Sequence, residues 1–509
     1  MNIYTVNQAT QGIADYLNSE FENPSVAIAY DSRINSDVFA KETAGVFAAN
    51  GIKVYIYPEL VPTPMLSFAV RRLSCSSGVI ITASHNPAKY NGYKCYDPEG
   101  YQMTDAAAAA AYEFIQKVDI FEDVKRMDFE KGLSEGIIEY ISEEISEEFF
   151  SAVSSKVINP DVCKNTDLKI IYTPLNGTGN KPVRKILDRL GIKNVKVVKQ
   201  QELPDGNFPT CPYPNPEIRQ AFECAIEMAK TEPADLLLAT DPDCDRMGIA
   251  VYDGKDYKLM TGNEVGSLFT EYVLSQYKEK GIMPKNPVVI KSFVTTDLVR
   301  VIANDYGAKV ADLLTGFKYI GEQIKWMEQA GKGHYVFGLE ESYGCLAGTH
   351  ARDKDAIVAV MCLCETAAWC KKHGMTCWDQ MLALYEKYGY YKETQYAITL
   401  KGIDGAAQIS AMMDKLRSNP PKNFGDLQVV EMRDYDKDQV KDMATGAVRP
   451  TGLPKSNVLY FELTNNSWCC ARPSGTEPKI KFYMGVKGTS LEDAQAKVDK
   501  LTADLKAIL

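Results

Sequence analysis

Short apolar segments alternate with amphipathic helical patterns along the first two-thirds of this 509-residue chain. Alternation of this kind is typical of α/β proteins, in which crossover helices connect largely parallel strands. The apolar segments are hydrophobic throughout, which indicates sheets that are covered on both faces. We predict strands at residues 25–32, 53–58, 78–84, 168–174, 195–199, 235–241, 287–293, 309–314 and 334–340, and helices at 104–117, 180–190, 216–230 and 262–280.

The pattern changes after about residue 390. Several strand-like segments follow one another with turns rather than long crossovers between them, and helical patterns cover 405–417 and 491–508. This arrangement predicts a smaller α+β domain at the C-terminal end. Because 509 residues exceed what one hydrophobic core can hold, we expect three or four domains in all.

Charge and cysteine usage exclude several classes of protein. A formal net charge of −10 argues against nucleic acid as the main partner. Thirteen cysteines without a CxxC pair indicate reduced, mostly buried thiols in a cytoplasmic protein. The N-terminus lacks the basic and apolar regions of a signal peptide, and the longest apolar stretch, 356–370, contains Glu365 and is short for a membrane span. No membrane role is expected.

Polar sequences follow three of the predicted strands. They read "ITASHNP", "LLLATDPDCDRMG" and "YVFGLEESYG". Ligands of α/β proteins bind beyond the carboxyl ends of strands, so we expect these three loops to form the walls of one cleft.

The hexapeptide "DPDCDR" predicts a metal site. Asp241, Asp243 and Asp245 place three carboxylates within five residues, and these would repel one another strongly without a cation. Oxygen ligands of this kind suit Mg²⁺. An EF-hand calcium loop is disfavoured because Arg246 occupies the position of the turn glycine and Tyr252 that of the final glutamate. Solvated loop acids remain the alternative, and Arg246 could present its guanidinium to a phosphate.

Ser84 in "TASHNP" is the candidate phosphoryl carrier. An open coordination position on the metal could accept an oxygen of a phosphoryl group on Ser84, which makes this serine part of the metal site. His85 could orient the phosphate or be a structural histidine. Asn91-Gly92 turns the chain so that Lys94 could return to the same pocket.

Two further loops carry candidate substrate ligands. Glu340 and Ser342 in "GLEES" could accept hydrogen bonds from sugar hydroxyls, although an acidic helix N-terminus is the alternative. The segment "RPSGTEP" has the composition of a phosphate cradle, with a bidentate arginine and a glycine that exposes backbone N–H groups. The candidate ligands in these and nearby loops are Thr315, Gly316, Lys318, Glu340, Ser342, Lys354, Arg472, Ser474, Gly475 and Thr476.

Taken together, the four motifs resemble the α-D-phosphohexomutase family, in the family's order and over nearly the whole chain. The segments "TGFKYIG", "GLEESYG" and "PDGNFPTCPYPNPE" are most similar to the phosphoglucomutase/phosphopentomutase branch. The resemblance implies three consecutive α/β domains with mixed sheets and a smaller C-terminal α+β domain around a central cleft. We place the domains at 1–160, 161–260, 261–385 and 386–509.

The resemblance also implies an activity. Ser84 would give its phosphoryl group to a sugar monophosphate, and the resulting bisphosphate would turn over and return its other phosphate. Glucose 1-phosphate would thereby become glucose 6-phosphate, with one Mg²⁺ per chain and glucose 1,6-bisphosphate as activator. Thr315 and Lys354 would touch the substrate by motif position. The general base is left open among Lys94, His85 and Lys318.

Several alternatives stay open at the level of sequence. The substrate could be a mannose, glucosamine or pentose phosphate, and the chain could be a monomer or a homodimer. A phosphatase-like hydrolase is disfavoured because domains that enclose the cleft would exclude water. Members of this branch also carry an upstream "GTAGLRG"-like loop with an arginine, whereas this chain starts at "MNIYTV". On that basis we expect a chain without the loop to be less soluble and less active than an extended one, or to be a sugar-phosphate binding protein.

Overall fold

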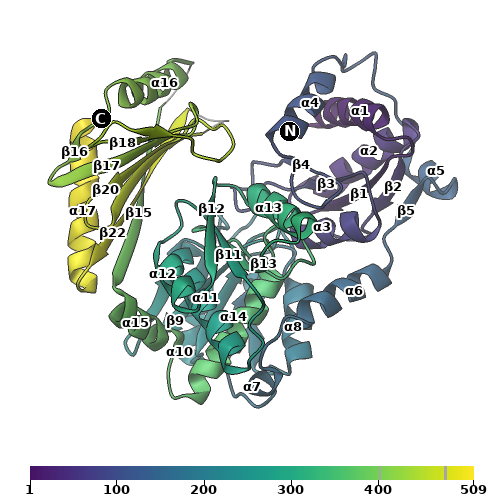
Figure 1. Ribbon diagram of the computed structural model, residues 1–509. Helices are drawn as coiled ribbons and strands as arrows, with labels where there is room; N and C mark the ends of the chain where they lie inside the picture. Colours follow the sequence, from purple (N-terminus) through teal and green to yellow (C-terminus); the bar gives the residue numbers. More distant parts are fainter. Residues whose placement is uncertain (401–402, 475–477) are drawn as a thin grey trace. The chain divides into compact units, whose positions relative to one another are not determined.

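The computed structural model describes residues 1–400, 403–474 and 478–509, and it divides into two compact units. The first unit comprises residues 1–291, 306–311 and 316–380. The second comprises residues 292–305, 312–315 and 381–509. Figure 1 labels the helices and strands in chain order. Three α/β sheets and one antiparallel sheet account for the strands of the described residues.

The first sheet has the strand order β4-β3-β1-β2-β5. β1, β2, β3 and β5 run parallel, and β4 joins the edge antiparallel to β3. Apolar side chains of β1 to β3 pack against α1 and α2 on one face, while α3 lies on the other face (Figure 1). The elements are β1 (Ser25–Tyr30), β2 (Lys53–Ile56), β3 (Ser77–Ile81), β4 (Tyr93–Tyr96), β5 (Ile138–Tyr140), α1 (Ile3–Glu20), α2 (Ser36–Ala49), α3 (Thr63–Arg72), α4 (Asp105–Ile115), α5 (Phe129–Ser134) and α6 (Glu143–Ser154).

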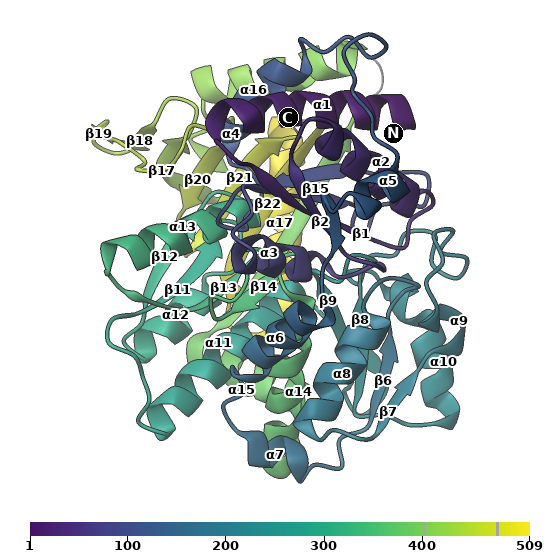
Figure 2. The same ribbon diagram turned by 90° about the vertical axis from the view of Figure 1, so that its right-hand side faces the viewer.

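The second sheet has the order β10-β9-β8-β6-β7. Its parallel strands are β6, β7 and β8, and the antiparallel β9 and β10 extend one edge. Figure 2 shows α8 on one side of this sheet and α10 on the other. The elements are β6 (Ile170–Thr173), β7 (Val195–Val197), β8 (Leu236–Thr240), β9 (Met247–Tyr252), β10 (Tyr257–Met260), α7 (Pro160–Lys164), α8 (Asn180–Leu190), α9 (Lys199–Glu202), the 3₁₀ helix η1 (Arg219–Phe222) and α10 (Glu223–Thr231).

The third sheet has the order β12-β11-β13-β14. Its helix α14 is apolar around most of its circumference and almost entirely buried, which is the pattern of a core helix. Among the residues that the structure describes, no helix combines the length and hydropathy needed to cross a membrane. The elements are β11 (Pro287–Ser292), β12 (Lys309–Leu313), β13 (His334–Leu339), β14 (Cys345–Ala347), α11 (Gly262–Glu279), α12 (Leu298–Asp305), α13 (Phe317–Ala330), α14 (Ala356–Lys372) and α15 (Cys377–Tyr388).

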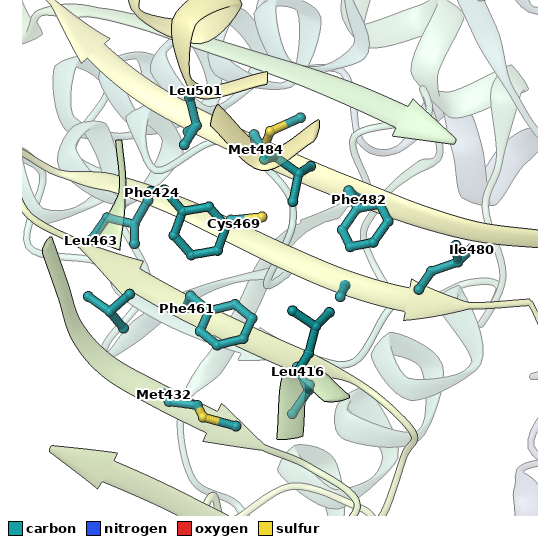
Figure 3. Packing of buried hydrophobic residues seen from close by; sticks show 14 of the residues in the cluster. Leu416, Phe424, Met432, Phe461, Leu463, Cys469, Ile480, Phe482, Met484 and Leu501 are labelled. Atoms are coloured by element: carbon teal, nitrogen blue, oxygen red, sulfur yellow. The ribbon is translucent and has the colours of Figure 1, made fainter. Parts of the chain in front are cut away.

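The antiparallel sheet lies in the second unit and has the order β15-β22-β21-β20-β17-β18-β19, with β16 paired to β17. Phe461, Cys469 and Met484 follow one another across β20, β21 and β22 in register, and they pack with Leu501 of α17 in a buried core (Figure 3). The elements are β15 (Tyr390–Thr399), β16 (Asn423–Phe424), β17 (Leu427–Asp434), β18 (Gln439–Asp442), β19 (Val448–Arg449), β20 (Leu459–Leu463), β21 (Ser467–Pro473), β22 (Lys479–Gly488), α16 (Ile403–Ser418) and α17 (Leu491–Ile508).

The strands predicted from apolar runs are all present, within a few residues of their expected bounds. Short antiparallel edge strands such as β4 and β14 were not predicted, because they are brief or only partly buried and lack a continuous apolar run. The three α/β sheets with an antiparallel C-terminal sheet confirm the predicted fold class. The four domain boundaries stay a prediction.

Helix capping provides a test of the fold. Thr261 begins α11 with a capping box: Glu264 N donates to Thr261 Oγ1 at 3.2 Å, and Thr261 N donates to Glu264 Oε2 at 2.7 Å. Thr104, the residue before α4, makes no such side-chain bond. We expect Thr261→Ala to lower the free energy of unfolding by about 1 kcal/mol. Thr104→Ala should change it by less than about 0.5 kcal/mol. Urea titration followed by circular dichroism measures both, and equal effects would contradict the assignment.

Candidate active site

Ser84 is held at the end of β3 in a strained conformation. Its φ of 52° lies in the left-handed region, which costs a residue other than glycine about 1 kcal/mol or more. The Ser84 N–H donates to Thr82 Oγ1 at 2.8 Å, and Ser84 Oγ donates to Asp241 Oδ2 at 2.8 Å. The side chain therefore faces the end of β8, 157 positions further along the chain.

Asp241, Asp243 and Asp245 follow β8 and converge. Each offers a carboxylate oxygen within 4.8 Å of the others, and all three residues are buried. Cys244, at φ 49°, turns the chain between them, and Asp241 Oδ1 accepts the N–H groups of Asp245 and Arg246. The loop is therefore a fixed turn rather than a solvated acidic segment.

Two oxygens of this cluster are left over for a ligand. Asp243 Oδ1 and Asp245 Oδ1 are buried and have no hydrogen-bond partner among the described residues, and Arg246 Nε lies 3.5 Å from Asp245 Oδ1 as an ion-pair contact. A buried carboxylate oxygen without a partner is costly, and a divalent cation would satisfy both oxygens at once. Burial and the neighbouring Asp243 raise the pKa of Asp241 and of Asp245. The residues present thus fit a hard divalent cation such as Mg²⁺.

Two lysines reach the carboxylates. Lys94 Nζ lies 3.1 Å from Asp243 Oδ2, and Lys354 Nζ lies 2.9 Å from Asp245 Oδ2. Burial alone would lower the pKa of Lys94, but Asp243 and Asp245 outweigh it and leave this pKa raised. Lys94 is therefore a cation at neutral pH. The return of the chain to the pocket, predicted from Asn91-Gly92, depends on Gly92, where a Cβ would stand 2.6 Å from Thr82 O.

His85 stands beside Ser84 in its neutral form. Its Nδ1 lies 3.3 Å from Ser84 Oγ, and its ring meets the ring of Tyr213 edge-on. Burial, with Arg246 as the next cause, lowers the pKa of His85 to about 2. At neutral pH this imidazole is uncharged and can form a hydrogen bond with a group at Ser84.

The "GLEES" segment is a turn between β13 and β14, not a helix N-terminus. Glu340 is buried and accepts a hydrogen bond from Gly316 N at 2.7 Å, and burial followed by Glu341 raises the pKa of Glu340. Arg246 Nη1 donates to Ser342 O at 2.9 Å. We call the loop of residues 241–246, which carries the candidate metal ligands, the metal loop. Arg246 therefore joins the metal loop to this turn.

The remaining predicted residues lie elsewhere. Lys318 forms an ion pair with Asp105 at 2.6 Å. Thr315 belongs to the second unit, as do Arg472 and Ser474 at the end of β21. Gly475 and Thr476 lie outside the described residues. The structure thus brings together Ser84, His85, Lys94, Asp241, Asp243, Asp245, Arg246, Gly316, Glu340, Ser342 and Lys354 within the first unit.

Two supports of the metal loop were missed from the sequence. Thr63, at the start of α3, binds Asp243 twice. Its N–H donates to Asp243 O at 2.9 Å, and its Oγ1 donates to Asp243 Oδ2 at 3.1 Å. Gly177 in "NGTGNKP" packs on Pro242, where a Cβ would stand 2.4 Å away. Thr63 follows the end of β2, so the strand-end rule that found the other loops also applies to it.

Comparison with known proteins identifies relatives of this chain. It matches family models for phosphoglucomutase/phosphomannomutase: alpha/beta/alpha domain I at residues 1–120, domain II at 147–254 and domain III at 261–388. It is 36% identical over 494 residues to a phosphoglucomutase of Staphylococcus saprophyticus, covering 97% of this chain and 88% of that protein.

Two solved structures share the fold. One is the phosphoglucomutase parafusin of Paramecium in an open form, with a TM-score of 0.73, 17% identity and coverage of 98% of this chain and 92% of that one. The other is a phosphoglucomutase/phosphomannomutase family protein of Burkholderia thailandensis, with a TM-score of 0.70, 19% identity and coverage of 100% and 94%.

The carboxylate cluster is testable without any activity. Asp243→Asn replaces a carboxylate that carries one of the two unpartnered oxygens by an uncharged amide, so we expect divalent cation affinity to fall at least about 10-fold. Isothermal titration with Mn²⁺ measures the change. Asp256→Asn, at an exposed aspartate of the same sheet's β9–β10 turn, is the control and should bind as the unmodified chain does. Equal affinity in all three proteins would contradict the metal assignment.

Proposed function

Because this chain belongs to the phosphoglucomutase/phosphomannomutase family, we propose that it interconverts glucose 1-phosphate and glucose 6-phosphate through a phosphorylated Ser84. The observation that carries the proposal is the 2.8 Å contact of Ser84 Oγ with a buried carboxylate cluster that has unfilled ligand capacity. A serine oxygen beside such a cluster suits transfer of a phosphoryl group, whose charge a cation offsets.

The proposed reaction consists of two transfers, each of a different phosphoryl group. In the first half, the bond between phosphorus and Ser84 Oγ breaks as a new bond forms to the free hydroxyl of the sugar phosphate, and that hydroxyl loses its proton. In the second half, Ser84 Oγ bonds to the phosphorus at the other end of the bisphosphate, the bond from that phosphorus to the sugar oxygen breaks, and this oxygen takes up the proton released in the first half. Glucose 1,6-bisphosphate is therefore both intermediate and activator, and no water is consumed.

The charges of the residues near Ser84 suggest a different role for each of them. Asp241, Asp243 and Asp245 would hold one Mg²⁺, with an oxygen of the phosphoryl group on Ser84 as a further ligand. Lys94, which is paired with Asp243, would be a cation beside this group. Of the three candidate bases, His85 is the one with a nitrogen 3.3 Å from Ser84 Oγ, so we assign it a hydrogen bond to the group at Ser84, and the general base stays open among Lys94, His85 and Lys318.

Candidate substrate ligands are proposed for each unit by itself. Glu340, Ser342, Gly316 and Lys354 in the first unit offer acceptors and donors for the sugar and its phosphate. Arg472, Ser474, Gly475 and Thr476, with Thr315, are proposed for the second unit on motif position. Two hydroxyl acceptors do not rank sugars, so mannose and pentose phosphates are the alternative substrates. A sugar-phosphate binding protein is the alternative without chemistry.

Ser84→Ala tests the proposal directly. We expect this variant to fold normally and to lose at least about 10³-fold in turnover, since it lacks the atom that carries the phosphoryl group. A coupled assay of glucose 1-phosphate conversion, with and without glucose 1,6-bisphosphate, measures the loss. Intact mass should show a phosphorylated fraction in the unmodified protein and in the exposed-site control Ser134→Ala. Turnover near the unmodified level in Ser84→Ala would refute the mechanism, and absence of turnover in all three would favour a binding protein.

Metal removal is a separate test. Chelation should abolish turnover, and Mg²⁺ should restore it better than Ca²⁺, because Ca²⁺ prefers a larger shell of six to eight oxygens than this cluster offers. The assay is repeated after dialysis with each cation. Full turnover in excess chelator would show that the carboxylates act without a metal.

A further inference from the structure

Arg33 binds the backbone of the Ser84 loop, residues 84–90, from inside the protein. The residue follows β1 and is only 3% exposed. Its Nη1 donates to Pro87 O at 3.0 Å and to Tyr90 O at 2.9 Å, and its Nη2 donates to Ser84 O and Asn86 O at 2.5 Å each. One guanidinium thus binds four carbonyl oxygens of a single loop.

Asp31 fixes this guanidinium and the other side of the loop. Arg33 Nε lies 3.3 Å from Asp31 Oδ2, and the same oxygen accepts a hydrogen bond from Thr82 Oγ1 at 2.6 Å. Thr82 Oγ1 in turn accepts the Ser84 N–H at 2.8 Å. The N–H and the C=O of Ser84 are therefore both tied, through Thr82 and Arg33, to one buried ion pair.

The ring of Phe208 completes the enclosure of Arg33. The guanidinium carbon lies 5.1 Å from the centre of this ring, a distance at which a cation is attracted to the aromatic face. Phe208 belongs to "PDGNFP", a segment that approaches the Arg33 loop so closely that a Cβ on Gly206 would stand 2.5 Å from Ile34 N. The position of Arg33 is thus set from two sheets.

The contacts explain how Ser84 keeps its left-handed conformation. Such a conformation persists only where surrounding contacts determine it. Carbonyl oxygens carry partial negative charge, and four of them are turned toward Arg33. Because a trans peptide places its C=O and N–H on opposite sides, the His85 N–H points away from Arg33. The loop is left with its negative ends neutralised, which suits a serine that carries a phosphate.

A purely structural ion pair does not account for this arrangement. A buried arginine–carboxylate pair contributes little net stability by itself. The planar fork of arginine is what allows one side chain to reach four acceptors, and lysine cannot reproduce it. The Nη1 and Nη2 groups of Arg33 donate to backbone carbonyls of the loop, and its side-chain partner is Asp31.

We propose that Arg33 is a positioning residue that holds the Ser84 loop in the geometry required for phosphoryl transfer, with Asp31 as its anchor. This inference rests on the proposed function of Ser84. Arg33 acts through the backbone and does not contact the sugar-binding turn of Glu340 and Ser342. Its loss should therefore slow the transfer step and spare binding of the sugar phosphate.

A cavity makes the proposal testable by chemical rescue. Arg33 lines a space of about 970 Å³ between the first and second sheets, together with residues such as Tyr57, Thr178 and Pro204. Removal of the side chain in Arg33→Ala would open a pocket for a guanidinium ion next to this space. The ion can then regain the loop carbonyls that the variant lost.

The experiment compares Arg33→Ala with the unmodified protein. We expect kcat to fall by about 10²-fold, the cost of a small misplacement of a reacting group, while KM for glucose 1-phosphate changes by less than about 3-fold. Millimolar guanidinium should recover a measurable part of kcat, and methylammonium should not. Hydrogen–deuterium exchange should become faster in segment 84–91. Arg33→Lys, which keeps the charge, should fold and show an intermediate kcat.

Arg71→Ala is the matched control. Arg71 is a half-buried arginine of the first unit that also binds backbone carbonyls: its Nη1 donates to Thr349 O and His350 O, away from Ser84. This variant should keep kcat, show no guanidinium rescue and leave exchange of segment 84–91 unchanged. An equal loss of kcat in both variants would show that Arg33 contributes only to the general stability of the fold and would overturn the positioning role.

The outcomes separate the two proposals. Absence of turnover in the unmodified protein refutes the proposed function. In that case, hydrogen–deuterium exchange of segment 84–91 still tests whether Arg33 holds the Ser84 loop. Turnover in the unmodified protein with unchanged kcat in Arg33→Ala overturns the positioning role. A rise in KM with unchanged kcat also overturns it, because Arg33 would then bind substrate. If Arg33→Ala does not fold, Arg33→Lys takes its place in the comparison. An unchanged kcat and unchanged hydrogen–deuterium exchange in Arg33→Lys would then overturn the positioning role.

Discussion

The contact between Ser84 Oγ and Asp241 Oδ2 is the interaction on which the site depends. It joins the end of β3 to the end of β8, and it places a nucleophilic oxygen at the edge of three buried carboxylates. That much negative charge is unfavourable without compensation. Much of the surrounding structure answers this requirement, through Lys94, Lys354 and the two oxygens left open for a cation.

Strain and charge are combined in the same loops. Ser84, Cys244 and Tyr343 all have left-handed backbone conformations, and each lies in one of the three strand-end loops. These conformations need outside support, which comes from other loops: Arg33 holds Ser84, Gly177 packs against the metal loop, and Arg246 binds the Ser342 carbonyl. The site is therefore preorganised by its neighbours and not by the motifs alone.

The fold could be predicted where each element carries its own signal. β1, β8 and β13 are apolar runs buried in a sheet, and α8 and α17 have amphipathic periodicity, so their bounds follow closely from the sequence. β4 and β14 could not be found in this way. They are short edge strands whose formation depends on the strand beside them, since an isolated segment of that length has no stability of its own.

The sequence by itself determined the residue types of the site and their places at strand ends, because a buried apolar run and the polar loop after it are local properties of the chain. It therefore identified Ser84, the three aspartates and Glu340. Only the tertiary structure showed that Lys94 lies beside Asp243 while Lys318 is paired with Asp105. The contacts of Thr63 with Asp243 and of Arg33 with the Ser84 loop are likewise visible only in the tertiary structure. These contacts join residues about 50 to 210 positions apart, and the packing of whole sheets, which no short segment encodes, brings them together.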